Sequence, residues 1–168
     1  MKAKFRKASI NDYNSISILR KQIHDYHSYH RPDFYKNKEL PFPKDEFESL
    51  FESSESKIYV VESGDKIYGY AITKVLSFQS NPLIVDHKRL FIDDIIIDPE
   101  NRKKGIGRFL MKKLESVCRS EGYNYLDLNV WSFNTEAIDF YRKHGMRESI
   151  LRMEKYIGKK NQSHRMYK

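Results

Sequence analysis

The chain of 168 residues has a single cysteine, Cys118, and this shortage is its first informative feature. A lone cysteine cannot form a disulfide within the chain and fits a reducing compartment, so we expect a cytoplasmic protein. Long apolar runs are also absent, and none approaches the roughly twenty residues of a membrane-spanning helix. We therefore expect no membrane partner. The basic N-terminal stretch runs into polar sequence and does not have the pattern of a secretory signal.

Internal repeats and low-complexity linkers are missing as well, whereas aromatic side chains are plentiful. The 12 tyrosines and 10 phenylalanines argue against disorder. We therefore predict one domain over residues 1–168, long enough to bury a core of ordinary size. Acidic residues are outnumbered, since 31 Lys and Arg against 23 Asp and Glu give a net charge of +8. This excess favours a negatively charged ligand or partner.

A basic turn with two glycines separates the strand-like run 90–98 from an amphipathic helix that we predict from about residue 105 to 119. The turn consists of Arg102, Lys103, Lys104, Gly105, Ile106, Gly107 and Arg108. Free amides at a helix N-terminus and the positive end of the helix dipole attract phosphate groups. The turn is not a P-loop, because Arg108 follows its last glycine, and it is not a dinucleotide-binding turn, because Leu110 replaces the third glycine.

The turn resembles the loop Arg/Gln-x-x-Gly-x-Gly/Ala with which the GCN5-related N-acetyltransferases, the GNAT family, hold the pyrophosphate of acetyl-CoA. A second segment resembles the other half of that cofactor site, because Asn134-x-x-Ala137 is followed by an aromatic residue and Tyr141. The motifs that carry the resemblance lie within about residues 90–146. In the rest of the chain, only the order of the predicted helices and strands is similar. It implies an α/β fold, the GNAT fold, with a central mixed β-sheet flanked by helices on both faces. It also implies direct transfer of the acetyl group of acetyl-CoA, as co-substrate, to a primary amine, with no metal.

The order of the predicted elements agrees with that fold. We predict strands over residues 5–10, 57–62, 67–73, 90–98, 125–130 and 146–156, and helices over residues 12–30, 44–51, 105–119 and 135–143. The polar residues 63–66 predict a hairpin turn between two of the strands. A loop is expected to lead from residue 73 to residue 90.

Tyr141 is the main catalytic candidate, because the resemblance places it near the cofactor sulfur, where its phenol would protonate the departing thiolate. Alternatively, Tyr141 is only a core residue of an amphipathic helix. The resemblance also places the Asn134 side chain on the cofactor, although asparagine is equally suited to capping the helix. It further implies that the backbone groups of Ile95, Ile96 and Ile97 pair with the pantetheine arm and the acyl carbonyl.

Asp93 and Asp94 are adjacent acids in an otherwise apolar strand, and alternation sends their side chains to opposite faces of the sheet. The attacking amine, with a pKa of about 10, must lose a proton, so an acceptor is needed nearby. In some members of the resembled family a glutamate earlier in this strand is the base, but Phe91 stands at the matching position. This leaves Asp93, with Asp94, to attract or deprotonate the amine, unless both acids only accept structural hydrogen bonds.

The sequence does not identify the acceptor amine. In the resembled fold the first helix borders the acceptor pocket, so Tyr26, His27 and Tyr29 are candidate substrate contacts together with Asp93. A small amine or polyamine, an aminoglycoside, and a protein N-terminus or lysine all remain open, as does a homodimer. So does a different function, in which the chain is a basic nucleic-acid-binding module whose turn contacts backbone phosphates. No recognisable nucleic-acid-binding motif supports that alternative.

Overall fold

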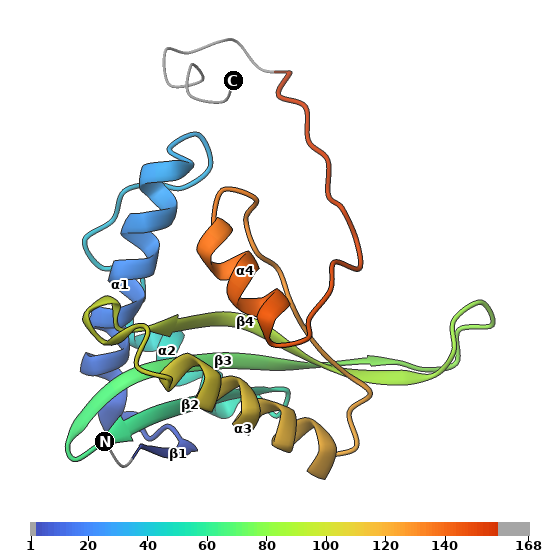
Figure 1. Cartoon of the computed structure of the whole chain (residues 1–168), viewed down its shortest axis with the longest axis horizontal. Coiled ribbons are helices and arrows are strands. Elements are labelled where there is room, and N and C mark those ends of the chain that lie inside the picture. The colour runs from blue at the N-terminus through green and yellow to red at the C-terminus, as the bar shows by residue number, and fades with distance from the viewer. Residues whose placement is uncertain (1–2, 158–168) are drawn as a thin grey trace.

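A computed structural model describes residues 3–157 and shows a five-stranded mixed sheet with helices on both faces (Figure 1). The strands, in their order across the sheet, are β1 (Lys4–Lys7), β2 (Ser56–Ser63), β3 (Lys66–Phe78), β4 (His87–Ile97) and β5 (Tyr125–Leu128). Neighbouring strands are antiparallel except β4 and β5, which run parallel. The mixed α/β sheet that the sequence predicts is therefore confirmed.

The helices divide between the two faces of the sheet. The helical elements are η1 (Ile10–Asp12), α1 (Tyr13–His30), α2 (Lys44–Glu52), η2 (Pro99–Asn101), α3 (Ile106–Ser120) and α4 (Thr135–Lys143). One buried cluster joins Ile16 of α1 and Phe47 of α2 to Tyr70 of β3. The other joins Leu110 of α3 to Ile92 of β4, and side chains of α4 pack at its margin. Helices α1 and α2 thus cover one face, and α3 and α4 cover the other.

Helical periodicity in the sequence accounts for the buried faces of these helices. Helix α3 buries Ile106, Leu110, Leu114 and Cys118, which recur every fourth residue, while most of its charged side chains are exposed. This is the amphipathic pattern that predicts the helix. Within residues 3–157, no helix is both long and apolar enough to cross a membrane.

A β-bulge at Asp93 changes which side chains of β4 face each layer. Two successive residues of β3 pair with Ile92 and Asp94, so Asp93 is the extra residue. Ile92 packs in the cluster with α3, whereas Ile96 packs in the cluster with α1. Strict alternation would have put both isoleucines on the same face, so the simple alternation predicted for this strand is wrong here. The bulge turns Asp94 toward α1.

Strands β4 and β5 pair over only part of their length. Their pairing starts with Arg89 opposite Tyr125 and ends with Ile92 opposite Leu128. Beyond that point, residues 94–97 pair only with β3 in the described part of the chain. The edge of β4 therefore lies open beside β5, just before the turn that leads into α3.

Two predicted segments differ from the structure. The strand predicted over residues 146–156 is wrong, because residues 146–157 form an exposed segment without helix or strand that leaves the end of α4 (Figure 1). An alternating pattern indicates a strand only where a neighbour pairs with it, and the described residues supply none. The loop predicted between residues 73 and 90 is shorter than expected and spans residues 79–86, since β3 continues to Phe78 and β4 begins at His87, and the two strands project outward as a ribbon (Figure 1).

Candidate active site

The open edge of β4 is the centre of the candidate active site. Ile95 and Ile97 pack toward α3, and Ile96 is buried toward α1, so their backbone lies between the two layers. The Ile97 carbonyl accepts a hydrogen bond from Arg102 Nε at 3.3 Å. The structure therefore places the three predicted isoleucines where an extended ligand could pair with a free strand edge.

The basic turn between β4 and α3 is held in shape by hydrogen bonds. The buried Asp98 carboxylate accepts from the Glu100 amide at 3.2 Å and from the Asn101 side chain at 2.8 Å. Asn101 in turn accepts from the Lys104 ammonium at 2.9 Å. Burial alone would raise the pKa of Asp98, but these hydrogen bonds and the nearby Lys66 ammonium together outweigh it and lower that pKa. The turn is thus ordered around an ionised carboxylate.

The N-terminus of α3 has the geometry of an anion-binding site. Gly105 precedes the helix with a φ of 83°, a left-handed conformation that glycine adopts without strain. No side chain in residues 3–157 caps this helix end, so its first amides, from Ile106 onward, are available to a ligand. Exposed cations surround it: Arg102, Lys103, Lys104 and Arg108. The structure thus brings the predicted phosphate-binding residues together.

Helix α4 lies close to the start of α3 because Gly107 has no side chain. A Cβ atom at this position would lie 3.1 Å from Phe140 Cζ, which is closer than ordinary van der Waals contact. The Phe140 ring in turn lies 5.4 Å from the ring of Tyr141, measured between centroids. The second glycine of the turn therefore sets how closely the helix that carries Tyr141 approaches the turn.

Asp94 is the centre of a polar network that joins α1, β3 and β4. The Tyr70 hydroxyl donates to Asp94 Oδ2 at 2.5 Å, and Arg20 Nη1 lies 3.2 Å from the same oxygen. Tyr70 is fully buried, whereas the Asp94 side chain is 17% exposed. Burial raises the pKa of Asp94, and Arg20 and Tyr70 oppose that rise. Asp94 is thus a partly accessible carboxyl group held in one orientation.

Asp93 lies in a different environment. It forms an ion pair of 2.9 Å with Lys74, and both side chains are well exposed to solvent. Such exposed pairs contribute little free energy, because water screens them. Of the two predicted acids, Asp94 is the one held by buried groups, and Asp93 is the one at the surface.

Tyr141 packs in the cluster with α3, but the charge of Asp94, on the α1 side of the sheet, affects its pKa. Burial, and then the charge of Asp94, raise the pKa of Tyr141 to about 12. The two predicted catalytic groups therefore share one electrostatic environment. A phenol with this pKa stays protonated at neutral pH, so it can donate a hydrogen bond or a proton.

Asn134 caps α4, as one of the two readings of its sequence position predicts. Its side-chain oxygen accepts a hydrogen bond from the Ala137 amide at 3.3 Å. The cap orients the end of α4 that follows β5 and the loop 129–133. A cofactor contact by Asn134 stays a prediction, compatible with this cap.

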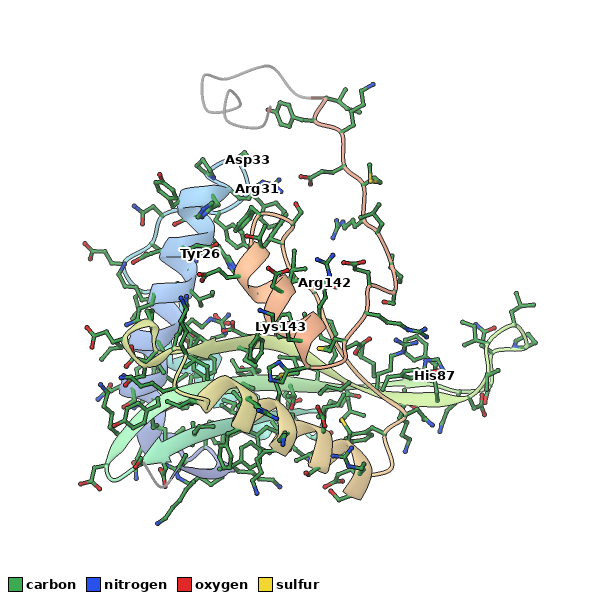
Figure 2. All side chains as sticks on the ribbon, in the orientation of Figure 1. Tyr26, Arg31, Asp33, His87, Arg142 and Lys143 are labelled. Atoms are coloured by element: carbon green, nitrogen blue, oxygen red, sulfur yellow. The ribbon has the colours of Figure 1, made fainter. Side chains whose placement is uncertain are left out.

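An aromatic wall, formed by Tyr26, His27, His30 and Phe133, joins α1 to the loop before α4. Figure 2 shows the position of Tyr26 on α1. His30 stacks on Phe133 with ring centroids 4.7 Å apart, and Tyr26 lies 5.8 Å from the same ring. Burial, followed by the charges of His24 and His30, lowers the pKa of His27 to about 4. His27 is therefore neutral at physiological pH. Two of the three predicted substrate contacts on α1 belong to this wall.

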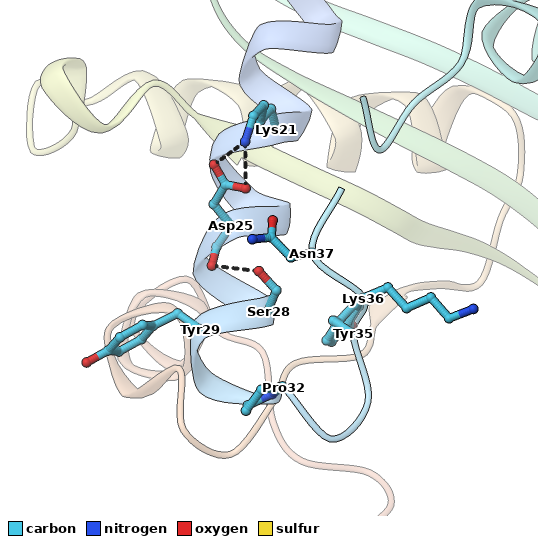
Figure 3. Close-up of a pocket in the computed structure, with 8 residues that line it drawn as sticks. All are labelled: Lys21, Asp25, Ser28, Tyr29, Pro32, Tyr35, Lys36 and Asn37. Atoms are coloured by element: carbon cyan, nitrogen blue, oxygen red, sulfur yellow. Dashed lines mark hydrogen bonds and ion pairs between the residues drawn. The ribbon is translucent and has the colours of Figure 1, made fainter. Parts of the chain in front are cut away.

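Tyr29, the third, lies elsewhere on α1. It is exposed and lines an open cavity of about 740 Å³ on the outer side of the helix (Figure 3). The residues around this cavity are Lys21, Asp25, Ser28, Tyr29, Pro32, Tyr35, Lys36 and Asn37. The predicted cofactor and catalytic residues are not among these lining residues. The Tyr29 ring also lies 5.1 Å from the ring of His30, so Tyr29 borders both this cavity and the aromatic wall.

Several residues of the site escaped the sequence analysis. Arg20 and Tyr70 reach Asp94 from distant parts of the chain, and no local motif marks them. Phe133 and Trp131 stand in the loop before α4, where two large aromatic residues in a short connection were the available signal. Trp131 is fixed by a 3.0 Å hydrogen bond from its indole nitrogen to the Tyr35 hydroxyl.

The chain resembles known proteins in sequence and in fold. The chain matches the model of the acetyltransferase (GNAT) family over residues 23–146. It is 33% identical to streptothricin acetyltransferase of Streptomyces lavendulae over 95 residues, which are 56% of this chain and 46% of the relative. It is 27% identical to ribosomal protein bS18-alanine N-acetyltransferase of Escherichia coli K12 over 103 residues, which are 60% of this chain and 68% of the relative. The chain thus spans less than half the length of the first of these relatives.

A solved structure resembles the whole described fold. The tetramutant of the BH1408 protein of Bacillus halodurans superposes with a TM-score of 0.89 and 26% identity, covering 92% of this chain and 99% of that chain. The likeness therefore extends beyond the two motifs, to helices α1 and α2 and to the strands that come before β4.

Proposed function

The chain belongs to the acetyltransferase (GNAT) family, and on that premise we propose that it transfers the acetyl group of acetyl-CoA directly to a primary amine. One observation carries the proposal: the free edge of β4, the uncapped start of α3 and Tyr141 surround one opening of the sheet. A helix start suits a pyrophosphate, a free strand edge suits an extended arm, and a protonated phenol suits a thiolate.

In this proposal acetyl-CoA lies across the opening. The amides that follow Gly105 bind its pyrophosphate, and the surrounding cations of residues 102–108 add attraction. The backbone of Ile95–Ile97 pairs with the pantetheine arm and holds the acetyl carbonyl beside α4. Asn134 caps that helix with its oxygen, which leaves its amide nitrogen for a hydrogen bond to the cofactor.

An acceptor that arrives as an ammonium ion first loses one proton to bulk water. The neutral amine then loses a second proton during the reaction, and one proton must reach the sulfur. The amine nitrogen attacks the acetyl carbonyl carbon, a C–N bond forms, and the C–S bond breaks. Asp94 takes the proton that the amine loses, directly or through water, and Tyr141 gives one to the departing thiolate. Proton transfer from Asp94 back to Tyr141 restores both groups, and the products are the acetylated amine and CoA.

We assign the role of proton acceptor to Asp94 rather than to Asp93, because the two carboxyl groups have different surroundings. Arg20 and Tyr70 hold Asp94 in place, and its charge reaches Tyr141. Asp93 is engaged by Lys74 at the surface and is the second candidate, through attraction of a cationic acceptor. Arg20 and Tyr70 are positioning residues in this assignment, since they act through Asp94.

The acceptor that fits best is a cationic primary amine. Carboxylates at the opening attract a cation, and the aromatic wall offers ring faces over which an ammonium group can lie. Tyr26 and His27 are the proposed contacts on α1, while Tyr29 would contact only an acceptor long enough to reach the outer cavity. The names of the two curated relatives describe acetylation of streptothricin and of a protein alanine, so an antibiotic amine and a peptide N-terminus are both suitable probes.

The proposal is tested by measuring acetyl-CoA binding and CoA release. Saturating acetyl-CoA should raise the melting temperature by several degrees, because a ligand at about 100 times its Kd stabilises the folded state by about 2.7 kcal/mol. A panel of amines should then reveal release of free CoA thiol. Tyr141→Phe should lower kcat about 100-fold and leave acetyl-CoA affinity nearly unchanged.

Two results would contradict these assignments. A melting temperature that acetyl-CoA does not move, together with steeply salt-dependent binding to nucleic acid, would favour the nucleic-acid-binding alternative instead. If turnover is unchanged in Tyr141→Phe, Tyr141 is not the general acid, but the rest of the proposal still stands. A single domain over residues 1–168, a cytoplasmic location and a homodimer are separate proposals, and none of them is needed for the reaction.

A further inference from the structure

A buried arginine at the end of α1, Arg31, holds two carboxylates. Its Nε and Nη2 donate to the two oxygens of Asp33, both at 2.9 Å, in the bidentate arrangement that guanidinium groups form with carboxylates. Its Nη1 lies 2.8 Å from a carboxylate oxygen of Glu154. The guanidinium also lies 4.5 Å from the centre of the Trp131 ring and 5.6 Å from that of Phe34. Asp33 and the two rings thus orient Arg31, while its third nitrogen binds a carboxylate from a distant part of the chain.

This distant carboxylate belongs to a segment with little other attachment. Glu154 lies in the exposed segment 146–157, which has neither helix nor strand. Its side chain is 62% exposed, whereas that of Arg31 is 10% exposed. The apolar neighbours Leu151, Met153 and Ile157 are each at least 80% exposed, so they bury little area that would hold the segment in place. Another carboxylate that makes the same contact with Arg31 can therefore replace Glu154 at little cost in free energy.

Arg31 continues the aromatic wall away from the opening. Trp131, on which the guanidinium lies, stacks on Phe133 with ring centroids 5.9 Å apart, and Phe133 belongs to the wall. Figure 2 shows Arg31 at the end of α1, beyond Tyr26. The wall therefore connects the candidate contacts for the acceptor to a preformed carboxylate site.

The length of α1 sets the distance between this site and the proposed reacting amine. Arg20 contacts Asp94, the proposed base, and Arg31 follows eleven residues later on the same helix. A helix rises about 1.5 Å per residue, so the two arginines lie roughly 16 Å apart along the axis. An acceptor that contacts both ends of the wall must be about this long.

We propose that Arg31 binds a carboxylate of the acceptor, and that Glu154 takes this position while the acceptor is absent. The site rests on the acetyl transfer proposed above and narrows the acceptor to a peptide: its N-terminal amine lies at the opening, and an acidic side chain pairs with Arg31. An extended peptide spans about 3.3 Å per residue, so the acidic residue comes about five residues after the N-terminus. A free amino acid is too short to reach both groups, and a polyamine lacks the carboxylate.

The first test measures peptide binding by intrinsic fluorescence, which needs no catalysis. Trp131 is the single tryptophan of the chain and lies against Arg31, so its emission reports on that site. The probes are peptides of alanine, serine and glycine with a glutamate at the fifth or the sixth position, which samples both faces of an extended chain. Their C-termini are amidated, which removes the terminal carboxylate, and the control peptides carry glutamine instead of glutamate.

We expect the better of the two glutamate peptides to have a Kd at least about tenfold lower than its glutamine control, as expected for a hydrogen bond to a charged group. Equal Kd values for the glutamate and glutamine peptides at both positions would overturn the proposal.

The second test uses variants to distinguish a competing carboxylate from a purely structural ion pair. Its readout is the ratio of the two affinities, glutamate peptide over glutamine peptide. Arg31→Gln should bring this ratio close to one. Glu154→Gln removes the competitor and should raise the ratio at least about threefold, because the site is then open to the peptide more of the time. Glu148→Gln is the matched control, since Glu148 is a 72% exposed acid of the same segment that pairs with Arg142 instead, and it should leave the ratio unaltered.

A ratio that Glu154→Gln leaves unchanged, or that a folded Arg31→Gln retains, would overturn the proposal. Because Arg31 is buried, its variant can fail to fold, and the exposed Glu154 then decides the question alone.

A missing carboxylate site and a missing transferase activity give different results. If the peptides cause release of CoA thiol but the glutamate and glutamine peptides have equal Kd and equal kcat/KM, the chain acetylates peptides without using Arg31. If the glutamate peptides bind more tightly but no amine causes release of CoA, acetyl transfer fails and the carboxylate site stands.

Discussion

At the scale of single residues, the proposed role of Asp94 as a general base depends on the opposing effects of its neighbours on its pKa. A general base must be ionised before the amine arrives and must still be basic enough to accept its proton. Burial raises the pKa of Asp94 and so increases its basicity, while Arg20 and Tyr70 favour its ionised form. The balance depends on groups from α1 and β3, which hold the carboxyl group without touching the reacting atoms.

Arg20→Gln tests this balance through the pH dependence of kcat/KM. Without the guanidinium 3.2 Å from Asp94, burial is less opposed, so the pKa of Asp94 rises further. A base acts only above its pKa, so the acidic limb of the profile should move to higher pH. At a pH on that limb, kcat/KM should fall about tenfold, since a neighbouring cation is worth at least that much in ionisation.

Two other variants control for a general loss of structure. Arg20→Lys keeps the charge and should restore most of the original profile. Lys21→Gln also removes a cation from α1, but Lys21 pairs with Asp25 at 2.7 Å on the exposed side of the helix. Its profile should match that of the original chain. An acidic limb that stays in place in Arg20→Gln would remove Asp94 from the role of base.

At the scale of elements, the distance between α3 and α4 sets how closely Tyr141 approaches the turn before α3. Gly107→Ala tests this, because its Cβ would lie 3.1 Å from Phe140 Cζ and force the ring or the helix to move. We expect a loss of about 1–3 kcal/mol in the free energy of unfolding, as for other overpacked contacts. Urea denaturation measures that loss, and titration shows whether acetyl-CoA affinity falls with it.

A smaller partner side chain should relieve the same contact. Phe140→Leu shortens the side chain that meets the new Cβ, so the double variant should be less destabilised than the sum of the two single variants. Strict additivity would mean that Gly107 and Phe140 do not set the distance between the helices.

The spacing of residues within short motifs predicted the turn and the helix that form the proposed acetyl-CoA half of the site. Gly105 adopts the left-handed conformation before α3, and Gly107 allows the close contact between α3 and α4. Asn134 caps the helix that it precedes. Each of these roles depends mainly on residues nearby in the sequence, so short motifs could predict where these residues lie. The bulge at Asp93 could not be predicted, because it is defined by which residues of β3 pair on either side. The strand predicted over residues 146–156 is wrong for a related reason, because a strand-like pattern does not say which neighbouring strand would pair with it.

At the scale of the whole molecule, four of the cations that contribute to the net charge of +8 gather at the turn before α3, namely Arg102, Lys103, Lys104 and Arg108. The turn before α3 exposes its cations to solvent, whereas the neighbouring Asp98 is buried and already engaged. Acidic and basic residues elsewhere often pair with each other, as Lys44 does with Glu48. The field at the turn is therefore positive, and it should attract an anionic ligand over some distance.

Salt should weaken CoA binding because of this field. The Debye length falls from about 10 Å at 0.1 M to about 3 Å at 1 M ionic strength, so the Kd for CoA should rise roughly tenfold over that range. Arg108→Gln, at the first turn of α3, should weaken binding at low salt and flatten the salt dependence. Lys44→Gln makes the same change in charge on α2, on the other face of the sheet, and should alter neither. Calorimetric titration at several salt concentrations gives the slopes, and equal slopes for the two variants would mean that CoA is attracted by the net charge of the molecule rather than by the turn.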